Sequence, residues 1–199
     1  MITLFHHPKT RSTRFIFLLE ELDAPYEIRA VNIRTRDGGS ADPANPHPVG
    51  KVPAIMDDGA LVFESPAIAL YLTDKFTANQ LGPLVGDPDR AAYLSWLGFY
   101  TGVLEPAFMS KFMNVEVPRP SAGWVAVDDA MTAIVKVLST GPYMLGERFS
   151  AADVLYGTTF AMFAKSPLMP KSTAVEDYVQ RIVGRAAFQK ALTLDGSGP

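Results

Sequence analysis

Three hydroxyl side chains, Thr10, Ser12 and Thr13, cluster just after the first predicted strand, and Arg11 lies between them. The apolar helical pattern that follows places this cluster at a helix N-terminus, where the helix dipole stabilises negative charge. A hydroxyl in that position, helped by Arg11, can donate to a thiolate and lower a thiol pKa from about 8.5 toward neutrality. Capping of the helix by Ser12 or Thr13 is the simpler alternative.

Glu64 and Ser65 form a second polar pair at a predicted helix start. The free backbone N–H groups of a helix N-terminus and the Ser65 hydroxyl suit a carboxylate, while Glu64 suits an ammonium group. Together the two residues would bind the head group of an α-amino acid. The alternative is a serine that caps the helix beside a solvated glutamate.

Pro53 begins a predicted strand and has no N–H to donate to a neighbouring strand. A cis bond between Val52 and Pro53 would turn the N–H and C=O of Val52 outward, where an extended peptide can pair with them. The alternative is a proline that protects a sheet edge from aggregation. Taken with the two polar clusters, Val52 indicates an anionic, peptide-like ligand.

The composition narrows the chemistry further. The 199 residues include no cysteine, which excludes disulfide frameworks, thiolate zinc sites and a catalytic cysteine supplied by the chain. Any sulfur chemistry must therefore use the sulfur of a ligand. His6, His7 and His47 make a poor metal site, because adjacent side chains on a strand point to opposite faces. We expect no metal.

Charge and hydropathy exclude two classes of partner. The 18 basic and 21 acidic residues give a net charge of -3, with no long run of like charges, so a nucleic-acid partner is not expected. The longest apolar stretch, Ala67 to Leu72, is far shorter than the roughly 20 residues that span a bilayer. The N-terminus also lacks a basic region followed by an apolar core. We expect no membrane association and a cytoplasmic protein.

The elements that must position these residues begin with an α/β unit. The predicted order is β-α-β, loop, β-β-α, at residues 2–6, 15–22, 27–33, 35–50, 52–56, 60–63 and 67–76. The first two strands should be parallel, since a helix connects them. Asp58-Gly59 predicts a two-residue hairpin, and Ser65-Pro66 predicts an N-cap followed by a first-turn proline. Among small domains, that order is the thioredoxin-like arrangement.

Residues 88–192 show helical patterns almost throughout. Helices are expected at 89–111, with a kink at Pro106, and at 124–138, 154–164 and 174–192, followed by a frayed tail from Asp195 to Pro199. Ser150 and Asp153 have capping-box spacing and open a helix that is apolar nearly all round, as in the centre of a bundle. The predicted domains are 1–78, a linker at 79–87 and an all-helical domain at 88–199.

Three motifs occur in the order and spacing of a known family: Gly50-Lys51-Val52-Pro53-Ala54, Glu64-Ser65 and Phe149-Ser150-Ala151-Ala152-Asp153. On these motifs the chain resembles the cytosolic glutathione S-transferases over residues 1–192. The resemblance implies an α/β plus all-α fold, in which an N-terminal thioredoxin-like domain is followed by a C-terminal helical bundle. It also implies glutathione as co-substrate and a homodimer.

The same resemblance assigns ligand contacts to positions of this chain. It puts Lys51 on the glycine carboxylate of glutathione and the Val52 backbone against the cysteinyl moiety, with Pro53 cis. Glu64 and Ser65 would hold the γ-glutamyl head group. His47 approaches the glycyl end, or else is a solvent-exposed loop histidine.

The position of the thiol-activating residue depends on the alignment. Matching Thr13-Arg14 to the small-residue-Arg pair of serine-type enzymes puts Thr10 where their thiolate-stabilising serine lies. Matching Pro8 to the bacterial cysteine-type enzymes puts Arg11 at the cysteine, a route that a chain without cysteine lacks. Thr10 is therefore the first candidate and Ser12 the second, although the branched Cβ of threonine restricts where its hydroxyl can point.

The second substrate, a small apolar electrophile, is expected against the first long helix of the helical domain. The candidate lining residues are Tyr100, Phe108 and Phe112. An aromatic stripe at helical spacing is also typical of a bundle core or a dimer contact.

The implied function is a glutathione S-transferase that activates the glutathione thiol for attack on an apolar electrophile. Substitution, conjugate addition, ether cleavage and isomerisation all begin with the same thiolate, so the sequence does not choose among them. Two alternatives on the same fold are a non-catalytic glutathione-binding or scaffold protein and a glutathione peroxidase-type activity.

Overall fold

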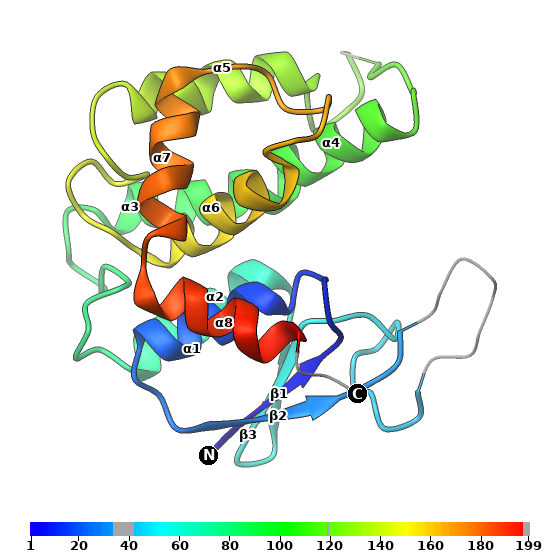
Figure 1. The fold of residues 1–199 in the computed structure, drawn as a ribbon, viewed down its shortest axis with the longest axis vertical. Helices are drawn as coiled ribbons and strands as arrows, with labels where there is room; N and C mark the ends of the chain where they lie inside the picture. Colours follow the sequence, from blue (N-terminus) through cyan, green and yellow to red (C-terminus); the bar gives the residue numbers. More distant parts are fainter. Residues whose placement is uncertain (34–41, 119, 197–199) are drawn as a thin grey trace. The chain divides into compact units, whose positions relative to one another are not determined.

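The computed structural model describes residues 1–33, 42–118 and 120–196. The chain divides into two units: Met1–Gln80 together with Arg185–Pro199, and Leu81–Gly184 (Figure 1). Part of the predicted loop at 35–50 and the last three residues of the predicted tail lie outside the described residues. None of the described helices is long and apolar enough to cross a membrane.

The first unit is built on a mixed sheet with the strand order β2-β1-β3-β4. Its strands are β1 (Ile2–His6), β2 (Tyr26–Ala30), β3 (Ala54–Asp57) and β4 (Ala60–Phe63). β1 pairs with β2 in parallel, and β3 pairs antiparallel with both β1 and β4. Asp58 and Gly59 both have positive φ, 48° and 88°, which a two-residue turn of the primed type requires. The predicted βαβ unit and hairpin are confirmed.

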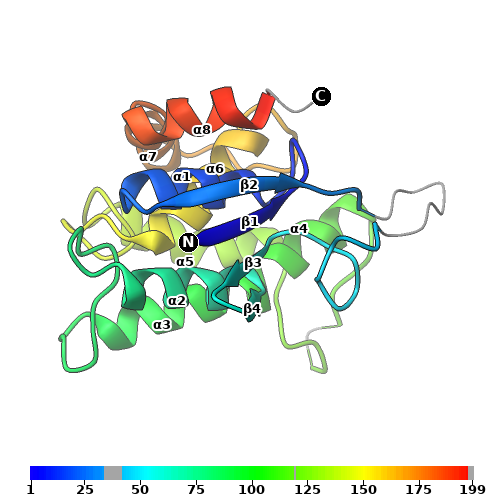
Figure 2. The ribbon, with the colours of Figure 1, turned by 90° about the horizontal axis from the view of Figure 1, so that it is seen from below.

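Helices α1 (Thr13–Glu21), α2 (Ser65–Lys75) and α8 (Ala186–Gly196) complete this unit. α1 buries consecutive apolar side chains from Phe15 to Leu19, as a helix does when it is covered on more than one side. α8 lies beside α1 in both views of the ribbon (Figures 1 and 2). The rings of Phe17 and Phe188 meet edge to face with centroids 5.4 Å apart.

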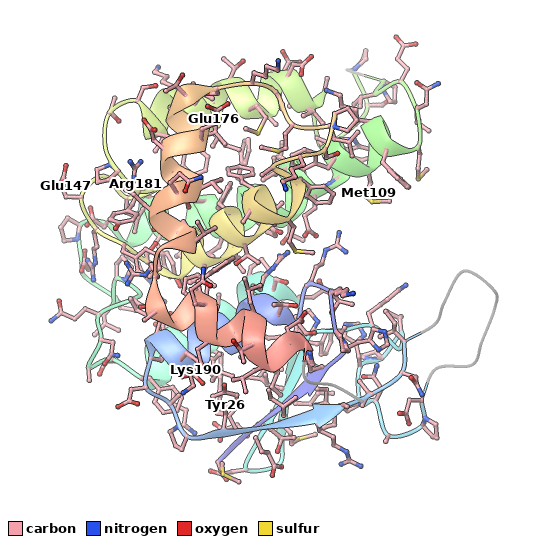
Figure 3. The ribbon with its side chains drawn as sticks, in the orientation of Figure 1. Tyr26, Met109, Glu147, Glu176, Arg181 and Lys190 are labelled. Carbon is pink, nitrogen blue, oxygen red and sulfur yellow. The ribbon has the colours of Figure 1, made fainter. Side chains whose placement is uncertain are left out.

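Ion pairs reinforce this contact between α1 and α8. Arg185 donates two hydrogen bonds to Glu21, at 2.6 and 2.8 Å. Glu20 binds Lys190 at 2.6 Å and accepts the hydroxyl proton of Tyr26 at the same distance; both partners are labelled in Figure 3. Burial and the hydrogen bond that Tyr26 donates to Glu20 raise the pKa of Tyr26. α8 is therefore fixed to the α/β unit along its length.

The single helix expected at 174–192 is wrong. The structure has α7 (Thr173–Val183) in the second unit and α8 in the first, with a break at Gly184. The two halves bury their apolar side chains in different units, Tyr178 and Ile182 in one and Phe188 and Ala191 in the other. Helical periodicity alone does not reveal such a change of packing partner. The helical domain predicted at 88–199 therefore differs from the structural units, which assign α8 to the N-terminal one.

The second unit contains α3 (Arg90–Phe99), α4 (Glu105–Phe112), α5 (Val127–Leu138), α6 (Ala151–Phe163) and α7. A π-helical turn, Tyr100–Leu104, joins α3 to α4. It directly precedes α4, and Pro106 lies in the first turn of α4, where a missing N–H costs least. The kink expected at Pro106 thus takes the form of a wider helical turn, a common way to interrupt a helix.

α6 is the buried centre of this unit. Every residue from Ala151 to Phe160 is buried, as its apolar surface predicts. The expected capping box is present: Asp153 accepts hydrogen bonds from the Ser150 N–H at 2.9 Å and the Ser150 hydroxyl at 3.1 Å. The thioredoxin-like domain followed by a helical bundle is confirmed as the fold class.

Candidate active site at one end of the sheet

The strand register gathers the predicted site residues at one end of the sheet. Phe5 near the end of β1 is opposite Ala54 at the start of β3, and Ala54 is opposite Phe63 at the end of β4. The turn that carries Thr10 follows β1, Val52–Pro53 precedes β3, and Glu64–Ser65 follows β4. The Thr10 turn therefore meets the two ends of the β3–β4 hairpin, from which it is distant in the sequence.

The Val52–Pro53 peptide bond is cis. Val52 packs in a small apolar cluster with Phe5, Val31 and Ala54. Val52 lies before β3, so it belongs to no strand pairing. Among the described residues, its N–H and C=O also make no backbone hydrogen bond in a loop or turn. The side chain of Lys51 is exposed, and its carbonyl accepts a hydrogen bond of 3.0 Å from the Asn45 amide.

Glu64 has an unusual backbone conformation at the start of α2. Its φ of 71° and ψ of 130° lie outside the helical region, and it occupies the N-cap position. The predicted N-cap, Ser65, is instead the first helical residue and is 7% exposed. No cap hydrogen bond is made by a side chain here. The expectation that Ser65 caps α2 is wrong, because the residue before it supplies the non-helical turn.

His47 is held in place by its loop. Its Nδ1 accepts the N–H of Val49 at 3.2 Å, which leaves the proton of the neutral ring on Nε2, 3.8 Å from Glu64 Oε1. The ring also meets Phe63 edge to face at 5.3 Å. Burial lowers the pKa of His47, against the opposing charge of Glu64. The structure thus buries His47 instead of leaving it in solvent, and joins it to the Glu64 segment.

The hydroxyl groups of the first turn bind one another. Thr10 donates to the His7 carbonyl at 2.6 Å, and its Oγ1 lies 2.8 Å from Ser12 Oγ. Ser12 Oγ also lies 2.8 Å from His6 Nδ1 and accepts the His7 N–H at 3.2 Å. Ser12 is at the N-cap position of α1, yet its side chain makes no cap hydrogen bond. Ser12 therefore organises the turn and does not cap the helix.

Two residues that the sequence did not single out as site residues complete this turn. Asp195 accepts the N–H of Lys9 with both carboxylate oxygens, at 3.1 Å each, and the hydroxyl proton of Thr13. The Nε2 of His6 lies 3.6 Å from Asp195 Oδ1. Burial lowers the pKa of His6, while Asp195 opposes that change.

No sequence signal points to Asp195, because the predicted helix ends at residue 192; in the structure Asp195 lies in the last turn of α8. An acidic residue in the last turn of a helix is disfavoured by the helix dipole, so its presence there asks for a compensating partner. The expected frayed tail is wrong at Asp195, which is only 7% exposed. Arg11, the other residue of the predicted catalytic group, is exposed in the same turn.

His6 and His7 serve different partners, as the alternation of a strand predicts. His7 Nδ1 lies 3.0 Å from the Val31 carbonyl, whereas His6 faces Ser12. Within the described ranges, no group of three or more His, Asp or Glu side chains is placed to hold a metal ion.

The predicted second-substrate residues differ in exposure. Tyr100 is fully buried, and its hydroxyl lies 2.7 Å from both Glu105 Oε1 and Thr159 Oγ1. Phe108 is also buried and stacks on Phe163 at 5.6 Å. Phe112, by contrast, is 62% exposed. The exposed residues Met109 and Met113 lie on either side of it in the sequence, and Figure 3 shows Met109 at the outer surface of α4.

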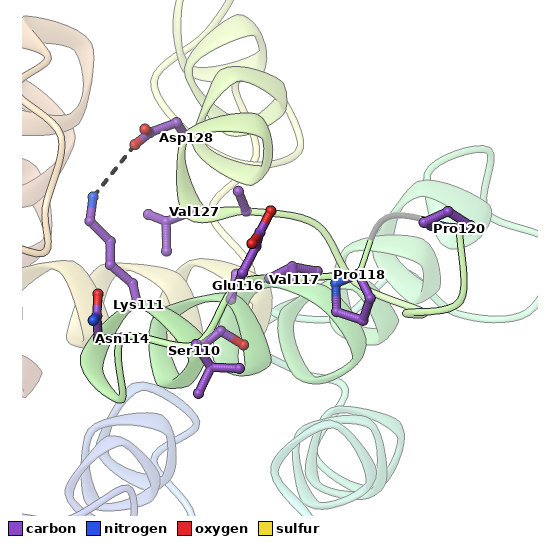
Figure 4. Close-up of a pocket in the computed structure, with 12 residues that line it drawn as sticks. Ser110, Lys111, Asn114, Glu116, Val117, Pro118, Pro120, Val127 and Asp128 are labelled. Atoms are coloured by element: carbon purple, nitrogen blue, oxygen red, sulfur yellow. Dashed lines mark ion pairs between the residues drawn. The ribbon is translucent and has the colours of Figure 1, made fainter.

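A pocket of about 760 Å³ lies in the second unit, between α4, the segment after it and the start of α5 (Figure 4). Its wall includes Val115, Val117 and Val127, with the ion pair of Lys111 and Asp128 at 3.6 Å. None of the three predicted second-substrate residues lines it.

Comparisons with known proteins find similar sequences and a similar structure. Residues 1–74 match the domain family described as "Glutathione S-transferase, N-terminal domain". Glutathione S-transferase 3 of Schizosaccharomyces pombe is 36% identical over 173 residues, which cover 77% of this chain and 70% of that protein. The disulfide-bond oxidoreductase YfcG of Escherichia coli is 28% identical over 211 residues, covering 96% and 94% of the two chains.

A solved structure extends the similarity to the whole fold. The glutathione S-transferase of a sphingomonad, complexed with glutathione, is 29% identical and has a TM-score of 0.76. The match covers 98% of this chain and 100% of the other.

Proposed function

The chain belongs to the glutathione S-transferase family, and from that premise we propose that it uses Thr10 to activate the glutathione thiol for attack on an apolar electrophile. The observation that carries the proposal is the convergence of the Thr10 turn, Val52–Pro53 and Glu64–Ser65 at one end of the sheet. Together the three segments offer a hydroxyl that can donate a hydrogen bond to sulfur, a backbone segment that can pair with a peptide, and a helix N-terminus that suits a carboxylate.

The peptide part of glutathione would lie along the second and third of these segments. The Ser65 hydroxyl and the N–H groups that open α2 suit the γ-glutamyl carboxylate, and the exposed carboxylate of Glu64 suits the ammonium group. The N–H and C=O of Val52 would pair with the cysteinyl backbone. The ammonium group of Lys51 would bind the glycine carboxylate. The Nε2–H of His47, 3.8 Å from Glu64 Oε1, would donate a hydrogen bond to the glycyl end.

The burial of Ser12 favours Thr10 as the residue that donates a hydrogen bond to the glutathione sulfur. Ser12 is fully buried and its hydroxyl is surrounded by Thr10, His6 and His7. Thr10 is partly exposed, and its proton goes to the His7 carbonyl. Turning that proton toward a bound sulfur would stabilise the thiolate, while Ser12 continues to support the Thr10 oxygen.

The apolar electrophile would meet the exposed part of α4 around Phe112. Methionine side chains adapt to irregular ligands, and Met109 and Met113 are both exposed beside Phe112. Tyr100 and Phe108, as packed in the second unit, would support this surface from within. The two-fold dimer and the cytoplasmic location remain predictions.

The test is to remove the Thr10 hydroxyl without changing the shape of the side chain. Thr10→Val should raise the pKa of bound glutathione by about one to two units, because a hydrogen bond to a charged group is worth roughly 1.5–3 kcal/mol. Ultraviolet absorption of the thiolate, followed across pH, measures this value. Thr10→Ser keeps the hydroxyl and should retain thiolate formation. An unchanged thiol pKa in Thr10→Val would remove Thr10 from the mechanism.

A second candidate is reduction of disulfides, the activity named for the relative from Escherichia coli. Since this chain has no cysteine, both sulfur atoms that are oxidised would have to come from two glutathione molecules. Turnover of a small disulfide with glutathione, in the absence of any apolar electrophile, would favour this candidate.

A further inference from the structure

The carboxylate of Asp195 reaches the Thr10 turn from the other end of the sequence. Lys9 donates its N–H to both oxygens and Thr13 donates its hydroxyl to one of them. Asp195 is 7% exposed, so little water competes for these bonds. Its carboxylate therefore bridges the residue before Thr10 and the residue that begins α1.

Lys9 is the residue of this turn that most needs support. Its φ of 57° lies in the left-handed region, which residues other than glycine adopt rarely. Because Lys9 directly precedes Thr10, the backbone conformation of Lys9 sets the direction in which Thr10 leaves the turn. Asp195 binds the N–H of Lys9 itself.

A second connection runs through side chains. His6 Nε2 lies 3.6 Å from Asp195 Oδ1, His6 Nδ1 lies 2.8 Å from Ser12 Oγ, and Ser12 Oγ lies 2.8 Å from Thr10 Oγ1. His6 and Ser12 are both buried, so this row of groups has little freedom to rearrange. The Thr10 hydroxyl is thus linked to Asp195 both through the backbone of the turn and through His6 and Ser12.

We propose that Asp195 is a positioning residue for thiol activation. It holds the Lys9–Thr13 turn in the shape that presents the Thr10 hydroxyl to bound sulfur, and it acts through the turn without touching glutathione. This inference rests on the proposed role of Thr10. It makes α8, the last described helix, part of the catalytic apparatus of the α/β unit.

Replacing Asp195 with alanine tests the proposal. Asp195→Ala should raise the pKa of the thiol of bound glutathione by about one unit. It should also lower kcat/KM for glutathione at neutral pH by about 10- to 100-fold, as expected when a reacting group is displaced. The affinity for S-methylglutathione, whose sulfur cannot ionise, should change by less than about twofold. Ultraviolet thiolate absorption and calorimetry give these two quantities separately.

Two variants separate positioning from simple loss of structure. Asp195→Asn keeps one oxygen that can accept from Lys9 and Thr13, so it should restore kcat/KM to within about threefold of the wild type. Glu21→Gln removes the ion pair between the end of α1 and Arg185, the residue before α8, and should leave the thiol pKa unchanged. If Asp195→Ala does not fold, Thr13→Val deletes one of the same hydrogen bonds and should raise the thiol pKa in the same direction.

Three results would overturn the assignment of Asp195: an unchanged thiol pKa in folded Asp195→Ala, an equal shift in Glu21→Gln, or a loss in Asp195→Asn as large as that in Asp195→Ala. Failure of the proposed function is a distinct result, because it shows in the wild-type protein. If the wild type binds glutathione without forming thiolate, both the role of Thr10 and the positioning by Asp195 are wrong.

Discussion

Thr10 and Ser12 are two residues apart, yet the fold gives their hydroxyls different tasks. Ser12 is enclosed by His6, His7 and Thr10, whereas Thr10 keeps part of its side chain at the surface. The residue types predicted a hydroxyl at this turn but not which one would be accessible. That choice depends on His6, whose burial beside Ser12 is set by the strand pairing of β1.

Ser65 is the residue whose substitution tests how glutathione is bound. Ser65→Ala should weaken glutathione binding by about 1–3 kcal/mol, or roughly 5- to 150-fold, because the γ-glutamyl carboxylate would lose a donor at a site that is largely buried. Calorimetric titration measures the change. Ser95→Ala, an exposed serine of α3 in the other unit, is the matched control and should bind normally. Equal affinities for wild type and Ser65→Ala would leave Ser65 as a purely structural residue.

The start of α6 shows how one helix end can control stability. Asp153 is fully buried and accepts hydrogen bonds from Met144 at 2.8 Å, Tyr178 at 3.0 Å and Ser150. Burial raises the pKa of Asp153 to about 6, although these hydrogen bonds oppose the change. At the start of α6, the folded protein therefore protonates this carboxyl group more readily than the unfolded chain does.

This shift predicts a pH dependence with a definite sign. Below about pH 4, Asp153 is protonated in both states. Between about pH 4 and 6 it is ionised in the unfolded chain but protonated in the folded protein, so stability falls as pH rises, by about 3 kcal/mol in total. Asp153→Asn cannot ionise and lacks this contribution. Urea unfolding of both proteins from pH 4 to 7 should show the free energy of the wild type falling relative to the variant; parallel curves would contradict the assignment.

The contact between α6 and α7 leaves no room for a methyl group at Gly157. A Cβ placed there would lie 2.5 Å from Ile182 Cγ1 and 2.9 Å from Cγ2. Gly157→Ala should therefore lower the free energy of unfolding by about 1–3 kcal/mol, despite the better helix propensity of alanine. Gly98→Ala in α3 meets nothing within 4 Å and should stabilise the protein by up to about 1 kcal/mol. Thermal or urea unfolding distinguishes the two, and a neutral Gly157→Ala would show that Ile182 can move aside.

At the scale of the whole molecule, local patterns predicted most of the fold. Strand alternation, the Asp58-Gly59 turn and the capping box at Ser150 each depend on neighbours in the sequence, and each is present in the structure. The three candidate site segments could also be selected from local patterns, because each lies at the end of a strand or the start of a strand or helix.

Long-range packing accounts for what was missed. Thr13 and Asp195 are 182 positions apart, and no local pattern connects them. The return of α8 to the α/β unit depends on complementary apolar surfaces, such as Phe17 against Phe188, and on the ion pair of Glu21 and Arg185. A helical period cannot show which unit a helix will join. For the same reason, the burial of Tyr100 and Phe108 could not be separated from a substrate wall on sequence alone.

The proposed function requires that this end of the sheet bind glutathione and ionise its thiol. The most direct measurement is a calorimetric titration of the wild-type protein with glutathione near neutral pH, repeated in two buffers with different ionisation enthalpies. The difference between the two heats counts the protons released. We expect binding with release of about one proton per glutathione, since the free thiol is mostly protonated at that pH. Binding without proton release, or no binding, would contradict the proposed function.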